Sequence, residues 1–283
     1  MSVCDNFIND WDNIVAGWFH EEIGIQKQYG KLVNMEYLPE PYWGNPNNCS
    51  LVIVNYNPGG GNDRNPHIYR GCCDCPKNQT RIVNFVKQTS YSNLMLPFPG
   101  LMSKEEIKKF GLDWFIDYDG YKWWQMKLEW INGLAKNLKV PTIKDGLKPF
   151  AIELCPWHKP QWTIGNSNTL LTYPLRKVVE KYVMNVIHEA IDNSEAKFAI
   201  FIGKFHCKFL ESFGFSKVPN NYEDKPCKSK ERYYHIYQKQ YKGHCHRVIV
   251  TYAKGSNRHP GKDFEKYEKV IISKYINKTI CYG

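Results

Sequence analysis

Residues 51–55 read LVIVN and run directly into YNPGGG at residues 56–61. A nearly continuous apolar run of strand length, rich in β-branched side chains, is typical of a parallel strand that is covered on both faces. The Asn, Pro and Gly residues that follow favour a turn, so the strand is expected to end there. Three later runs have the same apolar character, at residues 150–154, 198–203 and 247–252. The sequence therefore predicts a central four-stranded parallel sheet.

Helical patterns lie between these predicted strands. Apolar side chains recur at spacings of three and four over residues 121–138, 175–191 and 263–276, as they do along one face of a helix. Strands that alternate with helices indicate an α/β fold, here a three-layer α/β/α sandwich. We expect a single domain over residues 1–283, with insertions near residues 82–119 and 213–240.

The composition is that of a folded, basic protein. The 283 residues are 42% hydrophobic and 23% charged, which excludes an intrinsically disordered chain. No apolar run approaches the roughly 18 residues of a membrane helix. The N-terminus resembles neither a signal nor a transit peptide, so we expect a cytoplasmic protein without a membrane partner. The net charge of +10 favours nucleic acid as a partner, and a lysine-rich chain without such a partner is the alternative.

The ten cysteines suggest thiols or metal ligands. Disulfides are not expected in a reducing compartment. Cys72 and Cys75, with Cys73 between them, have the C-x2-C spacing of a zinc half-site. Neither Gly243–His246 nor His206-Cys207 repeats that spacing, so a second half-site is not evident and unliganded thiols are the alternative. We assign no cofactor and no metal to the functional site.

The loops after the predicted strands are where chemistry is expected, because ligands of such sheets bind at the carboxyl ends of the strands. These loops contain Gly or Pro together with polar side chains, at residues 57–61, 155–158, 203–206 and 254–261. The first loop is neither a P-loop nor a G-x-G-x-x-G fingerprint. The first loop therefore does not favour nucleotide hydrolysis or dinucleotide binding as the function.

Three of these loops carry a family resemblance. Asn55-Tyr56-Asn57-Pro58-Gly59 resembles the G-x-N-P-G motif of the uracil-DNA glycosylase superfamily, especially of its single-strand-selective and mismatch-specific branches, although Asn55 replaces the leading Gly. Residues 153–156 (ELCP) resemble the N-x-C-P element of the single-strand-selective branch. Residues 256–260 (SNRHP) stand where the superfamily carries an H-P-S-P-like loop. The resemblance implies a monofunctional DNA glycosylase that flips a base out of DNA.

The resemblance also implies roles for individual residues. Asn57 would position the water that attacks the anomeric carbon, and His259 would stabilise the departing base anion, with Tyr252 as the alternative at that position. Tyr69, twelve residues beyond Asn57, would stack on the flipped base, and a tyrosine packed on the surface is the alternative. Further substrate contacts are expected from Tyr56, Pro58 and Gly59.

Glu153 departs from the superfamily, which has Asn at this position to read uracil. A carboxylate only accepts hydrogen bonds, and it suits the exocyclic amino group of cytosine. Glu153 therefore favours a modified cytosine, such as glucosylated 5-hydroxymethylcytosine in phage DNA, which implies antiviral defence. A strand-end carboxylate paired with a Lys or Arg is the alternative for this residue. A uracil or deaminated-base repair glycosylase and a catalytically silent nucleic-acid-binding module are the alternative functions.

Basic residues flank the predicted site. Lys254, Arg258 and Lys262 surround the last loop, where Ser256 and Asn257 are also expected to contact DNA. Lys204, with His206 and Lys208, follows the third predicted strand. Phosphate contacts from such residues would make DNA binding sensitive to salt. No obligate protein partner is expected.

Overall fold

The structure of the protein, a computed structural model, describes residues 1–19, 40–56, 90–109, 124–125, 127–156, 175–219 and 232–253. The chain divides into two compact units. The first unit comprises Met1–Asn45, Asn57–Leu128 and Ile152–Val186. The second unit comprises Pro46–Tyr56, Glu129–Ala151 and Ile187–Gly283.

The described elements are distributed over both units. Those of the first unit are α1 (Val3–Phe19), β1 (Tyr42–Trp43), α5 (Tyr91–Met95), η1 (Pro99–Leu101), α6 (Lys104–Lys109), α10 (Leu175–Val179) and η4 (Glu180–Met184). Those of the second unit are β2 (Leu51–Asn55), η3 (Ile143–Asp145), β4 (Phe198–Ile202), α12 (Phe205–Ser212), β5 (Ser216–Val218), β6 (Arg232–Tyr241) and β7 (His244–Ala253). Three elements have residues in both units: α8 (Leu128–Leu138), β3 (Pro149–Glu153) and α11 (Asn185–Asn193).

Parallel strands form the middle of the sheet in the second unit. β2 pairs with β4 in parallel, with Ile53 opposite Ile200, and β4 pairs with β7 in parallel, with Ile200 opposite Ile249. All five residues of β2 and all five of β4 are buried. Both strands are almost entirely apolar, as is expected where both faces of a sheet are covered. The strands predicted from these apolar runs are confirmed.

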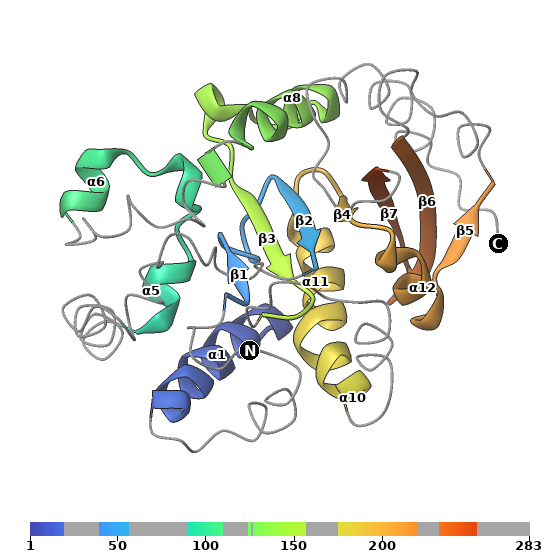
Figure 1. Cartoon of the computed structure of the whole chain (residues 1–283), viewed down its shortest axis with the longest axis horizontal. Helices are drawn as coiled ribbons and strands as arrows, with labels where there is room; N and C mark the ends of the chain where they lie inside the picture. The colour runs from blue at the N-terminus through green and yellow to red at the C-terminus, as the bar shows by residue number, and fades with distance from the viewer. Residues whose placement is uncertain are drawn as a thin grey trace. The chain divides into compact units, whose positions relative to one another are not determined.

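The sheet extends further than the sequence analysis predicted. Within the described residues, its hydrogen-bonded order is β1-β3-β2-β4-β7-β6-β5, so the sheet has seven strands there and not four. β6 pairs antiparallel with β7 and with β5, so the sheet is mixed (Figure 1). The turn between β6 and β7 is made by Lys242 and Gly243, which both have positive φ, 48° and 85°. Such a two-residue turn matches the twist of a hairpin.

Polar side chains explain why β6, the first strand of the β6–β7 hairpin, was not predicted. Residues 213–240 were interpreted as an insertion, yet β5 and most of β6 come from this segment. β6 buries Tyr234, Ile236 and Tyr237 but also carries the run Gln238-Lys239-Gln240, which hides its apolar pattern. A single exposed face of an antiparallel strand tolerates such residues.

The first unit is held together by side chains of α1. Asp12 accepts hydrogen bonds from the backbone N–H and the hydroxyl of Ser92, at 2.6 and 2.9 Å, which joins α1 to α5. Asp10 pairs with Lys181 at 2.8 Å and accepts a hydrogen bond from the hydroxyl of Tyr182 at 3.2 Å, which joins α1 to η4. The buried side chains of the first unit include Cys4, Phe7, Trp11, Tyr42, Trp43 and Met95.

The helices predicted between the strands are confirmed where the structure describes them. α8 occupies the second half of the predicted helix over residues 121–138. α10, η4 and α11 follow one another over residues 175–193, and η4 is a π-helical turn between the two α-helices. The helix predicted over residues 263–276 lies outside the described residues.

The structure also bears on the expected absence of membrane helices and on the state of the cysteines. Within the described segments, no helix is both long and apolar enough to cross a membrane. Cys4, Cys49, Cys155 and Cys207 are free thiols, as expected. Cys245 is disulfide-bonded, so the expectation that disulfides are absent is wrong for this residue.

Candidate functional site

The carboxyl ends of β2 and β4 mark the point in the sheet where a ligand is expected. In the strand order, β3 lies on one side of β2 and β4 on the other. Along the chain, the next strand after β2 is β3, on one side of β2 in the strand order, and the next described strand after β4 is β5, on the other side. In open α/β sheets, ligands bind in the crevice beyond such a switch point. Asn55 and Tyr56 stand at the end of β2, and Gly203 and Lys204 follow the end of β4.

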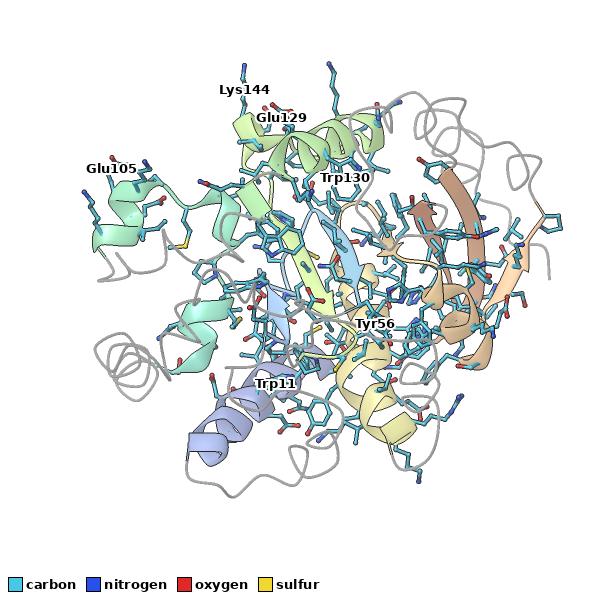
Figure 2. All side chains as sticks on the ribbon, viewed as in Figure 1. Trp11, Tyr56, Glu105, Glu129, Trp130 and Lys144 are labelled. Atoms are coloured by element: carbon cyan, nitrogen blue, oxygen red, sulfur yellow. The ribbon has the colours of Figure 1, made fainter. Side chains whose placement is uncertain are left out.

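Tyr56, labelled in Figure 2, follows β2 in the second unit and contacts the first residue of α12. Its side chain is 8% exposed. Its ring contacts Phe205 edge to face, with 5.0 Å between ring centroids and an interplanar angle of 72°. The centroid of the His206 ring lies 6.2 Å from that of Tyr56. The second residue of the Asn55–Gly59 motif is therefore packed against the start of α12.

A glycine allows α12 to begin directly after β4. Gly203 has a backbone φ angle of 126°, which residues other than glycine rarely adopt. Its N–H donates a hydrogen bond to the carbonyl of Thr251 at 2.9 Å, which ties the end of β4 to the end of β7. Lys204 precedes the first turn of α12 and is exposed. The predicted DNA contact of Lys204 is therefore compatible with its position.

His206 is not a charged residue on a DNA-facing surface. Its side chain is fully buried, and burial lowers its pKa from 6.5 to about 3, opposed by the carbonyl of Ile202. The imidazole is neutral at neutral pH. It packs against Phe201 and Phe209, with ring centroids 5.1 and 6.1 Å apart. His206 therefore supports the packing of α12 and does not add to the basic residues.

A histidine and a tyrosine pair at the carboxyl end of β7. The hydroxyl of Tyr252 lies 2.7 Å from Nε2 of His235, which comes from the neighbouring strand β6. Tyr252 is buried and His235 is half-buried. A hydrogen-bonded His–Tyr pair can hold or pass a proton. Tyr252 was predicted as an alternative leaving-group residue, whereas His235 was missed, because its partner is seventeen positions away on another strand.

Glu153 belongs to the first unit. It is the last residue of β3 and is 6% exposed. Its backbone N–H donates a hydrogen bond to the carbonyl of Pro41 at 3.0 Å. Glu153 is therefore a buried carboxylate at the end of this strand, and its role in reading a base stays a prediction.

Most predicted site residues lie outside the described part of the chain. They are Asn57, Pro58, Gly59, Tyr69, Lys254, Ser256, Asn257, Arg258, His259 and Lys262, together with Cys72, Cys73 and Cys75. The structure describes Tyr56, Glu153, Lys204 and Tyr252. Tyr56 and the residue after Lys204, Phe205, are in contact, which fits a common site at the ends of β2 and β4.

A second polar cluster lies at the other end of β7. Among the residues that the structure describes, Asp192, His244 and His246 could hold a metal ion, since their ligand atoms all lie within 4.8 Å of one another. The sequence analysis singled out the segment with His244 and His246 but did not join it to α11. A histidine–aspartate pair at helical spacing, His188 and Asp192, was the signal available.

Comparison of the chain with known protein families, with curated proteins and with solved structures finds no match.

Proposed function

We propose that this protein is a monofunctional DNA glycosylase that flips a modified cytosine out of DNA and hydrolyses its N-glycosidic bond. The observation that carries the proposal is the position of the Asn55–Gly59 motif, which starts at the end of β2, beside β4, where an open α/β sheet binds its ligand. We further propose that the fold is the three-layer sandwich of the uracil-DNA glycosylase superfamily, with β5 and β6 added at one edge of the sheet.

The packing of Tyr56 supports this assignment. Because its ring is buried against Phe205, the backbone that leads into Asn57 starts from a fixed position. Catalysis by a positioned water requires that the backbone carrying the positioning residue is held in place. Misplacement of a reacting group by about 1 Å can lower the rate about 100-fold. In the proposal, Asn57 holds the water and Tyr69 stacks on the flipped base.

The reaction is a hydrolysis in which all atoms are accounted for. The water oxygen bonds to the anomeric carbon, and the bond from that carbon to N1 of the base breaks. The electron pair of the broken bond leaves with the base, and the base takes up the proton that the water loses. His259 stabilises the anionic base as it departs, and an abasic site remains in the DNA.

Glu153 supports a base with an exocyclic amino group. The carboxylate of Glu153 only accepts hydrogen bonds, and N4 of cytosine can donate one to it when the base enters the site. Removal of unmodified cytosine would damage the DNA of the host, so we propose a substituted cytosine, such as glucosylated 5-hydroxymethylcytosine in phage DNA. The enzyme would then act in the cytoplasm as part of antiviral defence.

Basic residues support DNA as the substrate. The chain has a net charge of +10, and Lys204 is exposed next to the end of β4. The residues proposed to contact the DNA from the segment that follows β7 in the sequence are Lys254, Ser256, Asn257, Arg258 and Lys262. These contacts are expected to supply affinity rather than base selectivity.

The test is a cleavage assay on DNAs that contain uracil, cytosine, 5-hydroxymethylcytosine or glucosylated 5-hydroxymethylcytosine, with alkali to reveal abasic sites. Cleavage confined to modified cytosine supports the proposal, and Glu153→Gln should then lower that cleavage. Cleavage of uracil would instead indicate a repair glycosylase. DNA binding without cleavage of any substrate would indicate a nucleic-acid-binding module.

A further inference from the structure

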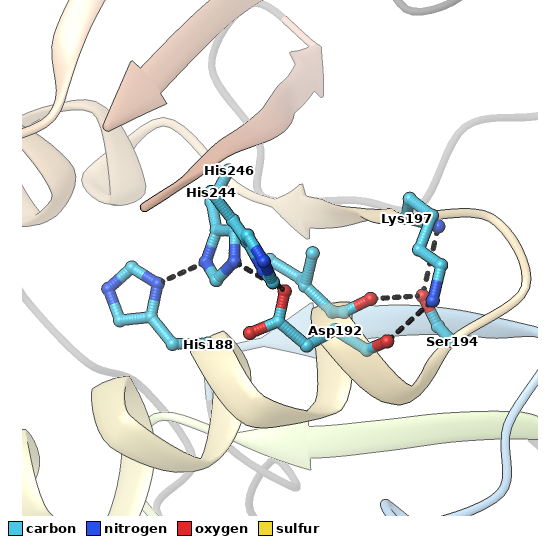
Figure 3. Close-up of polar contacts among 7 residues, drawn as sticks. His188, Asp192, Ser194, Lys197, His244 and His246 are labelled. Atoms are coloured by element: carbon cyan, nitrogen blue, oxygen red, sulfur yellow. Dashed lines mark hydrogen bonds and ion pairs between the residues drawn. The ribbon is translucent and has the colours of Figure 1, made fainter. Parts of the chain in front are cut away.

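We propose that Asp192, His244 and His246 form a binding site for one divalent transition-metal ion of the zinc class. The site is independent of the proposed glycosylase activity. All three residues belong to the second unit, with Asp192 on α11 and the two histidines on β7 (Figure 3).

The ligand atoms converge on one point. Oδ1 of Asp192 lies 2.8 Å from Nδ1 of His244 and 2.9 Å from Nε2 of His246. The three atoms lie within 4.8 Å of one another, so a single ion can reach all of them after small side-chain movements. Two imidazole nitrogens and one carboxylate oxygen leave a further position for water, as in zinc sites with three protein ligands.

Local structure sets this arrangement. Side chains at alternate positions of a strand point to the same face, so His244 and His246 share a face while Cys245 is on the other. Cys245 is disulfide-bonded, so it provides no thiolate. The amino group of Lys197 donates to the backbone carbonyl of Asp192, and Ser194 also caps the end of α11. The side chain of Asp192, in contrast, is directed to the histidines (Figure 3).

A buried histidine supports the proposed ligand His246. Nδ1 of His188 lies 2.6 Å from Nδ1 of His246, on the side of the His246 ring away from Asp192 (Figure 3). Metal-binding histidines usually hydrogen-bond through their second nitrogen, which fixes the ring and its tautomer. The His188 ring is itself held between Tyr241 and Phe215, with ring centroids 4.0 and 5.5 Å away and nearly parallel planes.

Burial distinguishes this cluster from an ordinary surface ion pair. The side chain of His246 is 2% exposed, that of Asp192 is 30% exposed and that of His244 is 66% exposed. One firmly held ligand and two accessible ligands provide a site that an ion can enter from solvent. Nitrogen donors with a single carboxylate favour zinc and similar metals over calcium or magnesium, which prefer oxygen ligands.

The position of the cluster indicates a structural role. His244 and His246 begin β7, directly after the hairpin turn, whereas the proposed DNA site is at the carboxyl end of the same strand. An ion held here would join the end of α11 to the β6–β7 hairpin. Because the unfolded chain lacks the assembled site, metal binding would stabilise the folded state.

The test uses the full chain, stripped with a chelator and then titrated with Zn²⁺ or with Co²⁺ as a spectroscopic probe. We expect one ion per chain at this site and a rise in Tm with Zn²⁺. His244→Ala removes an exposed ligand and should weaken binding by more than about 100-fold, since loss of an outer partner alone costs about 10–100-fold. His188→Phe keeps the aromatic stack and should weaken binding by about 10–100-fold.

Gln240→Ala is the matched control, since this exposed residue lies on β6 opposite Cys245, next to the cluster. It should bind Zn²⁺ and Co²⁺ as the unaltered chain does. The proposal is overturned if the unaltered chain retains no Zn²⁺ and shows no Co²⁺ absorption bands. It is also overturned if His244→Ala binds the same number of ions with the same affinity, because the metal would then lie elsewhere in the chain.

Discussion

The hydroxyl of Tyr252 and Nε2 of His235 lie 2.7 Å apart across the β6–β7 pair. The bond joins the last part of β7 to β6 beside the proposed DNA site. We expect Tyr252→Phe to lower the free energy of unfolding by about 1 kcal/mol, because one hydrogen bond of a buried side chain is lost. Urea denaturation measures this change, and an unchanged unfolding free energy would contradict it.

The Tyr252→Phe variant also tests whether His259 or Tyr252 stabilises the departing base. If His259 stabilises the departing base, His259→Ala should lower kcat by about 100-fold or more, and Tyr252→Phe should have a much smaller effect. Single-turnover cleavage of DNA with modified cytosine compares the two variants. A larger loss with Tyr252→Phe would transfer the role to Tyr252 and its partner His235.

Stability should decrease in acid because of His206. The pKa of this buried histidine is about 3 in the folded protein and 6.5 when it is exposed, so the folded state binds fewer protons. The associated stability is therefore fully present above pH 6.5 and is lost as the pH falls from 6.5 toward 3. One such group contributes a slope of about 1.4 kcal/mol per pH unit.

Denaturation between pH 8 and pH 5 checks this expectation. His206→Leu removes the titrating group and should flatten the pH dependence by that slope, whatever the variant does to stability at neutral pH. An identical slope in both proteins would show that His206 does not titrate as its burial implies.

The contact between Tyr56 and Phe205 should be measurable as a coupling energy. The two rings meet edge to face with centroids 5.0 Å apart. A double-mutant cycle with Tyr56→Ala and Phe205→Ala should give an interaction energy of about 0.5–1.5 kcal/mol in unfolding experiments. Additive effects of the two substitutions would contradict the direct contact between the end of β2 and the start of α12.

Lys204 should contribute to DNA binding through phosphate. Lys204→Ala should weaken binding to all DNA sequences alike and reduce the dependence of log K on log salt by about 1. Lys144→Ala is the control, because Lys144 is also exposed but precedes β3 at its amino end, and its side chain points away from the ribbon in Figure 2. Equal salt slopes for Lys204→Ala and the unaltered protein would contradict the contact.

The strands in the middle of the sheet could be predicted because burial on both faces leaves a clear trace in the sequence. β2 and β4 are continuous apolar runs, and the structure places them where the sequence analysis did. β6 could not be recognised in this way, since Gln238, Lys239 and Gln240 interrupt its apolar pattern. Its place in the sheet depends on pairing with β7, which is a tertiary contact.

The candidate sites show the same limit. The sequence analysis predicted chemistry at the ends of β2 and β3 from local motifs, and Tyr56 and Glu153 are found there. It did not predict that His235 pairs with Tyr252, or that Asp192 approaches His246, 54 positions away. Side chains that meet across strands and helices leave no local pattern, so only the fold reveals them.

We propose that this protein hydrolyses the N-glycosidic bond of a modified cytosine. The most direct measurement is detection by mass spectrometry of the free base released from DNA that contains glucosylated 5-hydroxymethylcytosine. The account predicts release by the unaltered protein and loss of release, with DNA binding retained, in Asn57→Ala. Failure of the unaltered protein to release this or any other modified cytosine base, or equal release by Asn57→Ala, would contradict the account.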